Sequence, residues 1–283
     1  FFFKQKTAYE IYQCDWSSDV CSSDLGKILN ERWAKAAEYF GIAFGVGSQR
    51  LAIEHDEAKE SFKVRKYAKN ALIFANLGAA QIVKWDIKKV LLAIDMIKAD
   101  ALFIHLNPLQ EACQYGGDTS FEGVIRAIEK INKEFIKLQI PLLVREVGFG
   151  MSKEVAKRLI DIGISGIDCA GAGGTSWSKV ESLCANNKQY QSLGECFAEW
   201  GIPTVDSINN VRSVSKTIPL IATGGIRNGE HIAKCLYLGA NIASMGQPML
   251  KAAIESEESL FEFIELVLLQ LRVALFSTTK LTV

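Results

Sequence analysis

The sequence lacks net charge, paired Cys-x-x-Cys motifs and a long uncharged apolar run. Its 32 Lys and Arg residues balance 32 Asp and Glu residues, which argues against general binding to a nucleic-acid backbone. An odd number of cysteines, seven, cannot all pair internally. Reduced thiols in a cytoplasmic protein are the simplest interpretation.

No segment has the pattern of a membrane span. The most apolar stretch, residues 260–276, contains Glu262, Glu265 and Arg272, which would be costly in a bilayer. These charges instead predict a long amphipathic helix with one wet face.

The first 25 residues differ in character from the rest. The chain begins with Phe1, shows no sustained helical or strand period up to Leu25, and lacks the apolar core of a signal peptide. The segment resembles a translated sequencing adapter. We therefore expect residues 1–25 to be an artefact or a disordered leader, and residues 26–283 to form one incomplete domain.

From Gly26 onward, short apolar runs alternate with segments of helical period, as in repeated βα units. Helices are expected from about residue 28 to 40 and at 82–98, 121–135 and 155–162. Residues 176–200 suggest a long loop. Strands are expected at residues 42–45, 71–76, 101–105, 142–146, 166–170, 203–206 and 220–223.

Seven strands with a helix before the first of them predict an α/β fold, a (β/α)8 TIM barrel whose strand one is missing. The glycine-rich or polar residues that close nearly every strand favour a barrel over the alternative, an open doubly wound sheet. A barrel without one strand leaves two unpaired edges. We therefore expect the polypeptide as written to be inactive or unstable.

Barrel active sites lie at the carboxyl ends of strands. Glycine-rich segments follow three strands, at residues 45–50, 171–177 and 224–229. Glycine lets the backbone approach a phosphate closely, although each segment could also be only a tight turn. Together they predict a phosphorylated cofactor.

A second group of polar residues follows the strand at 101–105. His105, Asn107, Gln110 and Glu111 place an imidazole, two amides and a carboxylate within seven positions. Mg²⁺ commonly takes one protein carboxylate together with substrate phosphate oxygens, so Glu111 suggests magnesium delivered with a diphosphate. Arg145 and Glu146 end another strand where a cofactor ring would lie, or form a structural ion-pair network.

These segments occur in a familiar order. Gly-Val-Gly-Ser-Gln-Arg at 45–50, Asn-Leu-Gly-Ala at 76–79, His-Leu-Asn-Pro-Leu-Gln-Glu at 105–111, Gly-Ala-Gly-Gly-Thr-Ser-Trp at 171–177 and Gly-Gly-Ile-Arg-Asn-Gly at 224–229 resemble type 2 isopentenyl-diphosphate delta-isomerases. The resemblance implies that the complete parent protein is an isomerase of isoprenoid biosynthesis that interconverts isopentenyl and dimethylallyl diphosphate. It also implies reduced FMN, NADPH as its reductant, Mg²⁺, and a homo-oligomer, a tetramer or octamer.

The resemblance also assigns residues by matched position. Gln110 would be the catalytic position, where it orients the reacting carbons, because an amide has no useful acid or base pKa. Glu111 would hold Mg²⁺. The substrate would be lined by Ser48, Gln49, Arg50, His105, Asn107 and Gln110. FMN would contact Ser48, Asn76, Arg145, Thr175, Gly224, Gly225, Arg227, Met245 and Gly246.

The sequence departs from the family at several points. Arg145 stands where the family usually has Lys, and Ala170 lacks a hydroxyl that some members offer to the flavin. The family's N-terminal Arg-Lys segment and Met-Thr-Gly-Gly turn have no counterpart, and the chain stops early at Val283.

Two other kinds of protein remain possible. One is another FMN barrel, such as a 2-hydroxy-acid oxidase or an IMP-dehydrogenase-like enzyme. His231 lies too far along a helix for the oxidase, and Cys169, the candidate nucleophile for the other, more plausibly packs within a strand. The second is a noncatalytic barrel that binds a phosphorylated ligand.

Overall fold

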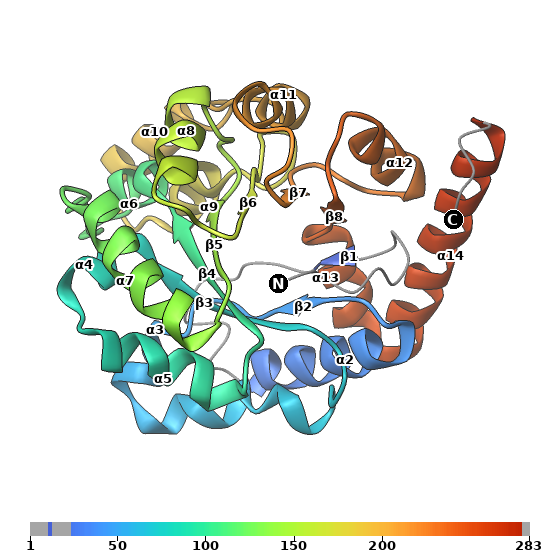
Figure 1. Ribbon diagram of the computed structural model, residues 1–283, viewed down its shortest axis with the longest axis horizontal. Coiled ribbons are helices and arrows are strands. Elements are labelled where there is room, and N and C mark those ends of the chain that lie inside the picture. The colour runs from blue at the N-terminus through green and yellow to red at the C-terminus, as the bar shows by residue number, and fades with distance from the viewer. Residues whose placement is uncertain (1–10, 13–23, 279–283) are drawn as a thin grey trace.

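Eight parallel strands curl into one sheet with helices around its outside (Figure 1). This computed structural model describes residues 11–12 and 24–278. The strand order is β1-β8-β7-β6-β5-β4-β3-β2, and every neighbouring pair is parallel. The strands are β1 (Ile11–Tyr12), β2 (Phe44–Gly45), β3 (Ile73–Gly78), β4 (Ala101–Leu106), β5 (Leu142–Glu146), β6 (Gly166–Asp168), β7 (Leu220–Ala222) and β8 (Ile242–Ser244).

The helices follow the strands in the βα rhythm expected of a barrel. Side-chain caps begin several of them, for example Ser152 at α8 and Asn228 at α12. The α-helices are α2 (Asp24–Phe40), α3 (Arg50–Glu54), α4 (Ala79–Lys84), α5 (Ile87–Ile97), α6 (Pro108–Cys113), α7 (Val124–Leu138), α8 (Lys153–Asp161), α9 (Trp177–Cys184), α10 (Lys188–Cys196), α11 (Thr204–Val214), α12 (Gly229–Tyr237), α13 (Gln247–Glu255) and α14 (Glu257–Ser277). Two short 3-10 helices, η1 (Asp56–Phe62) and η2 (Val64–Lys66), lie between α3 and β3.

The barrel fold is confirmed, but the structure differs from the local predictions at four places. Residues 203–206 begin α11 because Pro203 precedes a helical period that buries Ile208 and Val211. The predicted loop at 176–200 forms the helix pair α9 and α10. Strand β8 was missed because it has only three residues, Ile-Ala-Ser. The segment 82–98 is divided between α4 and α5.

A short strand, β1, lies at the position of the barrel where we expected strand one to be missing. Strand β1 pairs with β8 through Ile11 with Ala243 and Tyr12 with Ser244. These two residues belong to the segment that we left out of the fold on sequence grounds, and α2 also starts within it, at Asp24. The rest of that segment, residues 1–10 and 13–23, lies outside the described residues. No helix of the described ranges is long and apolar enough to cross a bilayer.

The carboxylate of Glu146 fixes the loop that follows β5. Its Oε2 accepts hydrogen bonds from the backbone N–H groups of Val147 at 2.7 Å, Gly148 at 2.8 Å and Phe149 at 2.5 Å. Burial raises the pKa of Glu146 from 4.5 to about 7, although these N–H donors act in the opposite direction. The loop therefore depends on a carboxyl group whose charge is costly.

We expect Glu146 to make the protein less stable as the pH rises from about 4.5 to about 7. In that window the unfolded chain releases a proton that the folded chain keeps, so the free energy of unfolding falls, by at most about 3 kcal/mol. Glu146→Gln keeps an acceptor oxygen and removes the titration. Urea unfolding at pH 5 to 8 measures the difference between the variant and the unmodified chain.

The variant must be compared with the unmodified chain because buried His105 changes the pH dependence of stability in the opposite direction. Burial lowers its pKa to about 4, so its contribution to stability is lost as the pH falls. The exposed Glu154→Gln on α8 is the matched control and should keep the pH dependence of the unmodified chain. An unchanged pH dependence in Glu146→Gln would refute the assignment.

Candidate functional site

A cavity of about 600 Å³ opens at the carboxyl ends of β5 to β8. Two glycine-rich loops form one side of it, residues 171–175 after β6 and residues 224–227 after β7. Apolar side chains form another part of the lining: Val147, Trp177, Val180, Ile226 and Leu250. The cavity therefore joins a polar backbone surface to an apolar wall, as a cofactor with a phosphate and a ring requires.

The two loops pack backbone against backbone. A Cβ atom added to Gly224 would lie 1.9 Å from the carbonyl oxygen of Gly171, and one added to Gly225 would lie 2.5 Å from that of Gly173. Gly225 also has φ +70°, which side-chain-bearing residues rarely adopt. Arg227 Nη2 donates to the Gly173 carbonyl at 3.0 Å and so ties the loops together.

The N-terminus of α13 contributes a third part of the lining. Gly246 precedes the helix and lines the cavity together with Gln247 and Pro248. Backbone N–H groups at a helix start favour an anion. Met245 is fully buried in the core, so its expected contact with FMN would have to come from its backbone.

Arg145 is buried at the floor of the cavity. Its Nη2 lies 3.4 Å from Oδ2 of Asp168, and its guanidinium carbon lies 5.5 Å from the centre of the Phe103 ring. Arg145 and Asp168 are 2% and 0% exposed, so this ion pair lies inside the barrel and not on its rim. The planar guanidinium is held by a carboxylate and also lines the cavity.

Asn76 and His105 form a buried pair at the ends of β3 and β4. Nδ1 of His105 lies 2.9 Å from Oδ1 of Asn76, and Asn76 Nδ2 donates to the Val46 carbonyl at 3.2 Å. Burial lowers the pKa of His105 to about 4, with Glu111 acting in the opposite direction. The imidazole is therefore neutral at pH 7, and donation from Nδ1 to Asn76 makes Nε2 the acceptor.

The polar residues of α6 form one connected group. Asn107 Nδ2 donates to Glu111 Oε1 at 3.0 Å and reaches Gln110 Oε1 at 3.4 Å. Glu111 Oε2 accepts from the backbone N–H of Asp118 at 2.7 Å. Oδ1 of Asn107 is buried and has no hydrogen-bond partner in the part of the chain that the structure describes. The group around Glu111 thus includes one buried amide oxygen without a partner among the described residues.

Glu181 joins this group and was missed by the sequence analysis. Gln110 Nε2 donates to Glu181 Oε1 at 2.9 Å, across 71 positions of the sequence. Burial raises the pKa of Glu181, with the bond from Gln110 acting against this and the nearby Glu111 adding to it. Glu181 follows cavity-lining Val180 on α9, so α9 connects the two halves of the site. The sequence analysis missed Glu181 because it expected residues 176–200 to form a loop, not helices.

The side chain of Gln49 is buried and hydrogen-bonded within the protein. Its side chain is 0% exposed; Nε2 donates to the Ala93 carbonyl at 3.0 Å, and Oε1 accepts from Asn76 N–H at 3.0 Å. These bonds hold β3 against the turn after β2, a structural role. Ser48 and Arg50 on either side are partly exposed, and Arg50 Nε lies 3.7 Å from Glu54 Oε2.

No cluster of three His, Cys, Asp or Glu side chains that could enclose a metal occurs within residues 11–12 and 24–278. A metal at Glu111 would therefore need further ligands from water and substrate. Cys169 is fully buried, which raises the pKa of its thiol and argues against a nucleophile.

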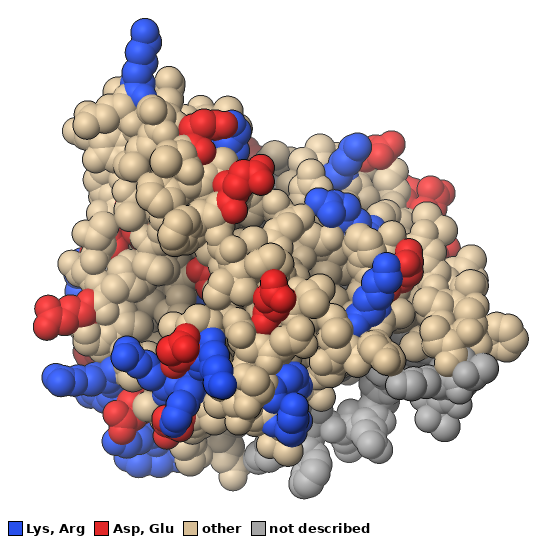
Figure 2. Space-filling view, turned by 90° about the horizontal axis from the view of Figure 1, so that it is seen from above, with Lys and Arg blue, Asp and Glu red and all other residues tan. Residues whose placement is uncertain are grey.

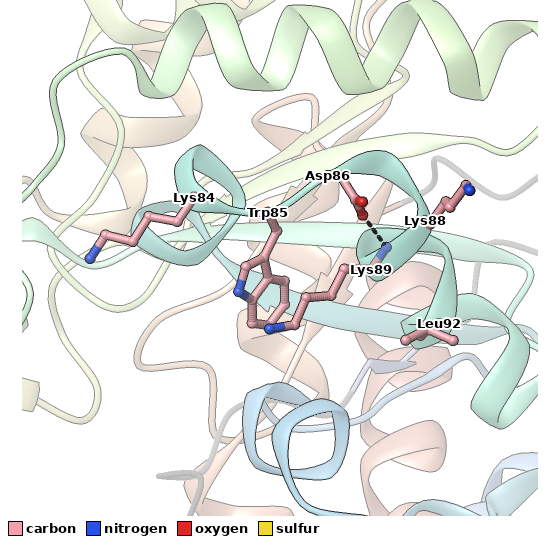
Figure 3. Close-up of a pocket in the computed structure, with 6 residues that line it drawn as sticks. All are labelled: Lys84, Trp85, Asp86, Lys88, Lys89 and Leu92. Carbon is pink, nitrogen blue, oxygen red and sulfur yellow. Dashed lines mark hydrogen bonds between the residues drawn. The ribbon is translucent and has the colours of Figure 1, made fainter.

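A second hollow, of about 550 Å³, lies among α4, α5 and the link between them (Figure 3). Trp85 and four charged residues line it, and Lys89 Nζ lies 4.4 Å from the centre of the Trp85 ring. No strand end contributes to it, so we assign it no role. Positive and negative side chains are interspersed on the face shown in Figure 2, without an extended area of one sign.

Comparisons with known proteins agree with this geometry. The family model of FMN-dependent dehydrogenases matches residues 32–279. Solved structures with the same fold include (S)-mandelate dehydrogenase, with a TM-score of 0.64 and 16% identity over 94% of this chain and 75% of that chain. Mandelate oxidase has a TM-score of 0.62 and 14% identity over 95% of this chain and 74% of that chain. At this identity the likeness concerns the fold alone.

Sequence relatives are much closer. A protein of Nostoc sp. named isopentenyl-diphosphate delta-isomerase is 46% identical over 93% of this chain and 74% of its own length. Proteins of the same name from Vibrio campbellii and Rickettsia rickettsii are 44% and 42% identical, over 89% and 94% of this chain and 74% and 77% of their own lengths. The chain therefore belongs to the isopentenyl-diphosphate delta-isomerase family, among the FMN-dependent barrels.

Proposed function

We propose that the chain binds FMN in the cavity at the ends of β5 to β8 and isomerises isopentenyl diphosphate to dimethylallyl diphosphate. The observation that carries this proposal is the contact between Gln110 and Glu181, which connects the polar group on α6 to the wall of the glycine-loop cavity. An anion-binding cavity and a diphosphate-binding group thus share one mouth of the barrel.

The residues around the cavity fit FMN. Thr175, Gly224, Gly225 and Gly246 would hold the phosphate through backbone and hydroxyl donors, and α13 would add its positive end. Arg145 would face the ring system. Arg227 would support the phosphate site by tying its loops together. The remaining predicted contacts are those of Ser48, Asn76 and Met245.

When bound, reduced FMN would supply the acid–base chemistry of the isomerisation, and NADPH would be its reductant. The chain's own residues bind and orient the substrate. Ser48, Arg50 and His105 would bind the diphosphate. Gln110 would orient the reacting carbons, because Asn107 and Glu181 hold its amide from two sides.

Glu111 and Asn107 would hold Mg²⁺ between the protein and the diphosphate. Their oxygens suit a hard cation, and Oδ1 of Asn107 is buried without a partner among the described residues. A homo-oligomer, a tetramer or octamer, in the cytoplasm completes the proposal.

The first test concerns FMN binding. Gly225→Ala would bring a Cβ within 2.5 Å of the Gly173 carbonyl and force the two loops apart, so we expect it to lose most bound FMN. Gly41→Ala is the matched control, since Gly41 has φ +65° but no atom within 4 Å of the added Cβ. Both variants carry the cost of a left-handed backbone, about 1 kcal/mol. Flavin absorbance after reconstitution and gel filtration measures the difference; equal FMN content would contradict the assignment.

The second test concerns magnesium. Glu111→Gln is expected to weaken Mg²⁺-dependent binding of isopentenyl diphosphate by about tenfold or more, because it removes the anionic ligand. FMN binding should not change. Isothermal titration with and without Mg²⁺ measures this, with the exposed Glu122→Gln as the control. An equal effect of Mg²⁺ in both variants would argue against Glu111.

The third test concerns Gln110. Gln110→Ala should retain FMN and substrate affinity but lower turnover by about 100-fold, as expected when a positioning group is lost. Gln114→Ala, on the exposed end of the same helix, is the control. Turnover by the unmodified chain is the reference. Its absence would instead support the sequence-based expectation of an inactive polypeptide.

A further inference from the structure

Thr204, the first residue of α11, bonds to both glycine loops of the cavity. Its backbone N–H donates to the Ala172 carbonyl at 3.3 Å, which joins it to the loop after β6. Its Oγ1 donates to the Gly224 carbonyl at 2.7 Å, which joins it to the loop after β7. Thr204 is only 9% exposed, so water does not readily replace these bonds. One buried residue thus bridges the two loops.

The loops fit closely around Thr204. A Cβ atom added to Gly171 would lie 2.3 Å from Cα of Thr204, and one added to Gly224 would lie 2.7 Å from its Oγ1. The residue before it is also fixed, because Pro203 forms a parallel β-bridge with Ala172. The hydroxyl therefore has little freedom to leave the Gly224 carbonyl.

The carbonyl and N–H groups of the two loops differ in how they are satisfied. Arg227 and Thr204 donate hydrogen bonds to the loop carbonyls. In contrast, the backbone N–H groups of Gly174, Gly224 and Gly225 have no acceptor among the residues that the structure describes. All three glycines line the cavity. The loops thus direct their negative ends to the protein and leave donors for an anion.

We propose that Thr204 is a positioning residue of the FMN phosphate site and gives the chain a preference for FMN over riboflavin, the same flavin without the phosphate. The inference rests on the proposed binding of FMN in this cavity. Thr204 is not among the residues that line the cavity, so it acts through the loops. Its hydroxyl compensates the partial negative charge of the Gly224 carbonyl oxygen, which would otherwise weaken phosphate binding at the neighbouring N–H groups.

The test compares the affinities of the full chain, freed of flavin, for FMN and for riboflavin. Thr204→Val keeps the shape of the side chain but removes the hydroxyl. It should weaken FMN binding by about tenfold or more, because the Gly224 carbonyl loses its donor. Riboflavin has the same ring system but no phosphate, so its affinity should stay nearly unchanged. Fluorescence titration of each flavin measures both dissociation constants.

Three further variants separate the hydroxyl from the rest of the side chain. Thr204→Ser keeps the hydroxyl and should retain the FMN preference of the unmodified chain. Thr204→Ala removes the hydroxyl without adding a methyl group, and it should lose the preference as Thr204→Val does. Thr217→Val is the matched control, since Thr217 is exposed and precedes β7, at the end of that strand opposite to the cavity. Circular dichroism confirms that each variant is folded.

Two results would overturn the role of Thr204 while leaving the FMN site in place. One is an unchanged ratio of the two affinities in Thr204→Val and Thr204→Ala, or an equal loss of both flavins, as expected of a residue that only supports the fold. The other is a Thr204→Ser variant that behaves like Thr204→Val. An unmodified chain that binds FMN no more tightly than riboflavin would instead overturn the proposed phosphate site and this inference with it.

Discussion

The site depends on the contact between two glycine loops. Their backbones lie so close together that no residue with a side chain would fit at the contact. Gly171 and Gly173 after β6 meet Gly224 and Gly225 after β7 at distances that a Cβ atom would not allow. Donors within the protein take the loop carbonyls: Thr204 Oγ1 donates to the Gly224 carbonyl at 2.7 Å, and Arg227 donates to that of Gly173. The carbonyl oxygens are therefore already paired, and an anion in the cavity does not have to face them unsatisfied.

The two glycine loops could be predicted from the sequence because glycine has a specific structural use at these positions. A glycine run after a buried apolar strand has few structural uses, and the carboxyl ends of parallel strands meet at one edge. Strand prediction failed at two other places. Residues 203–206 resemble an apolar strand but begin helix α11, and β8 has only three residues, too few to show a strand period. Short elements in a barrel are specified by their neighbours more than by their own residues.

Long-range pairs could not be derived from sequence spacing. The charges of Arg145 and Glu146 were recognised, but their partners were not. Arg145 pairs with Asp168 on the neighbouring strand, while Glu146 binds the backbone of its own loop. Removing Asp168 would take the carboxylate away from a buried guanidinium, so the pair helps to fix the position of Arg145 beside the cavity. Gln49 shows the same limit, since its sequence motif gave no sign that its side chain bonds to Ala93 and Asn76.

Helix α9 shows why the two halves of the site act together. Trp177 and Val180 belong to the cavity wall, while Glu181, the next residue, accepts a hydrogen bond from Gln110 on α6. A shift of α9 that opened the cavity would also move the acceptor that holds Gln110. Because α6 carries Glu111 one position further on, a shift of this short helix would move Gln110 and Glu111 together. The βα connections after β4 and β6 thus form a single unit, although 71 residues separate the two side chains that join them.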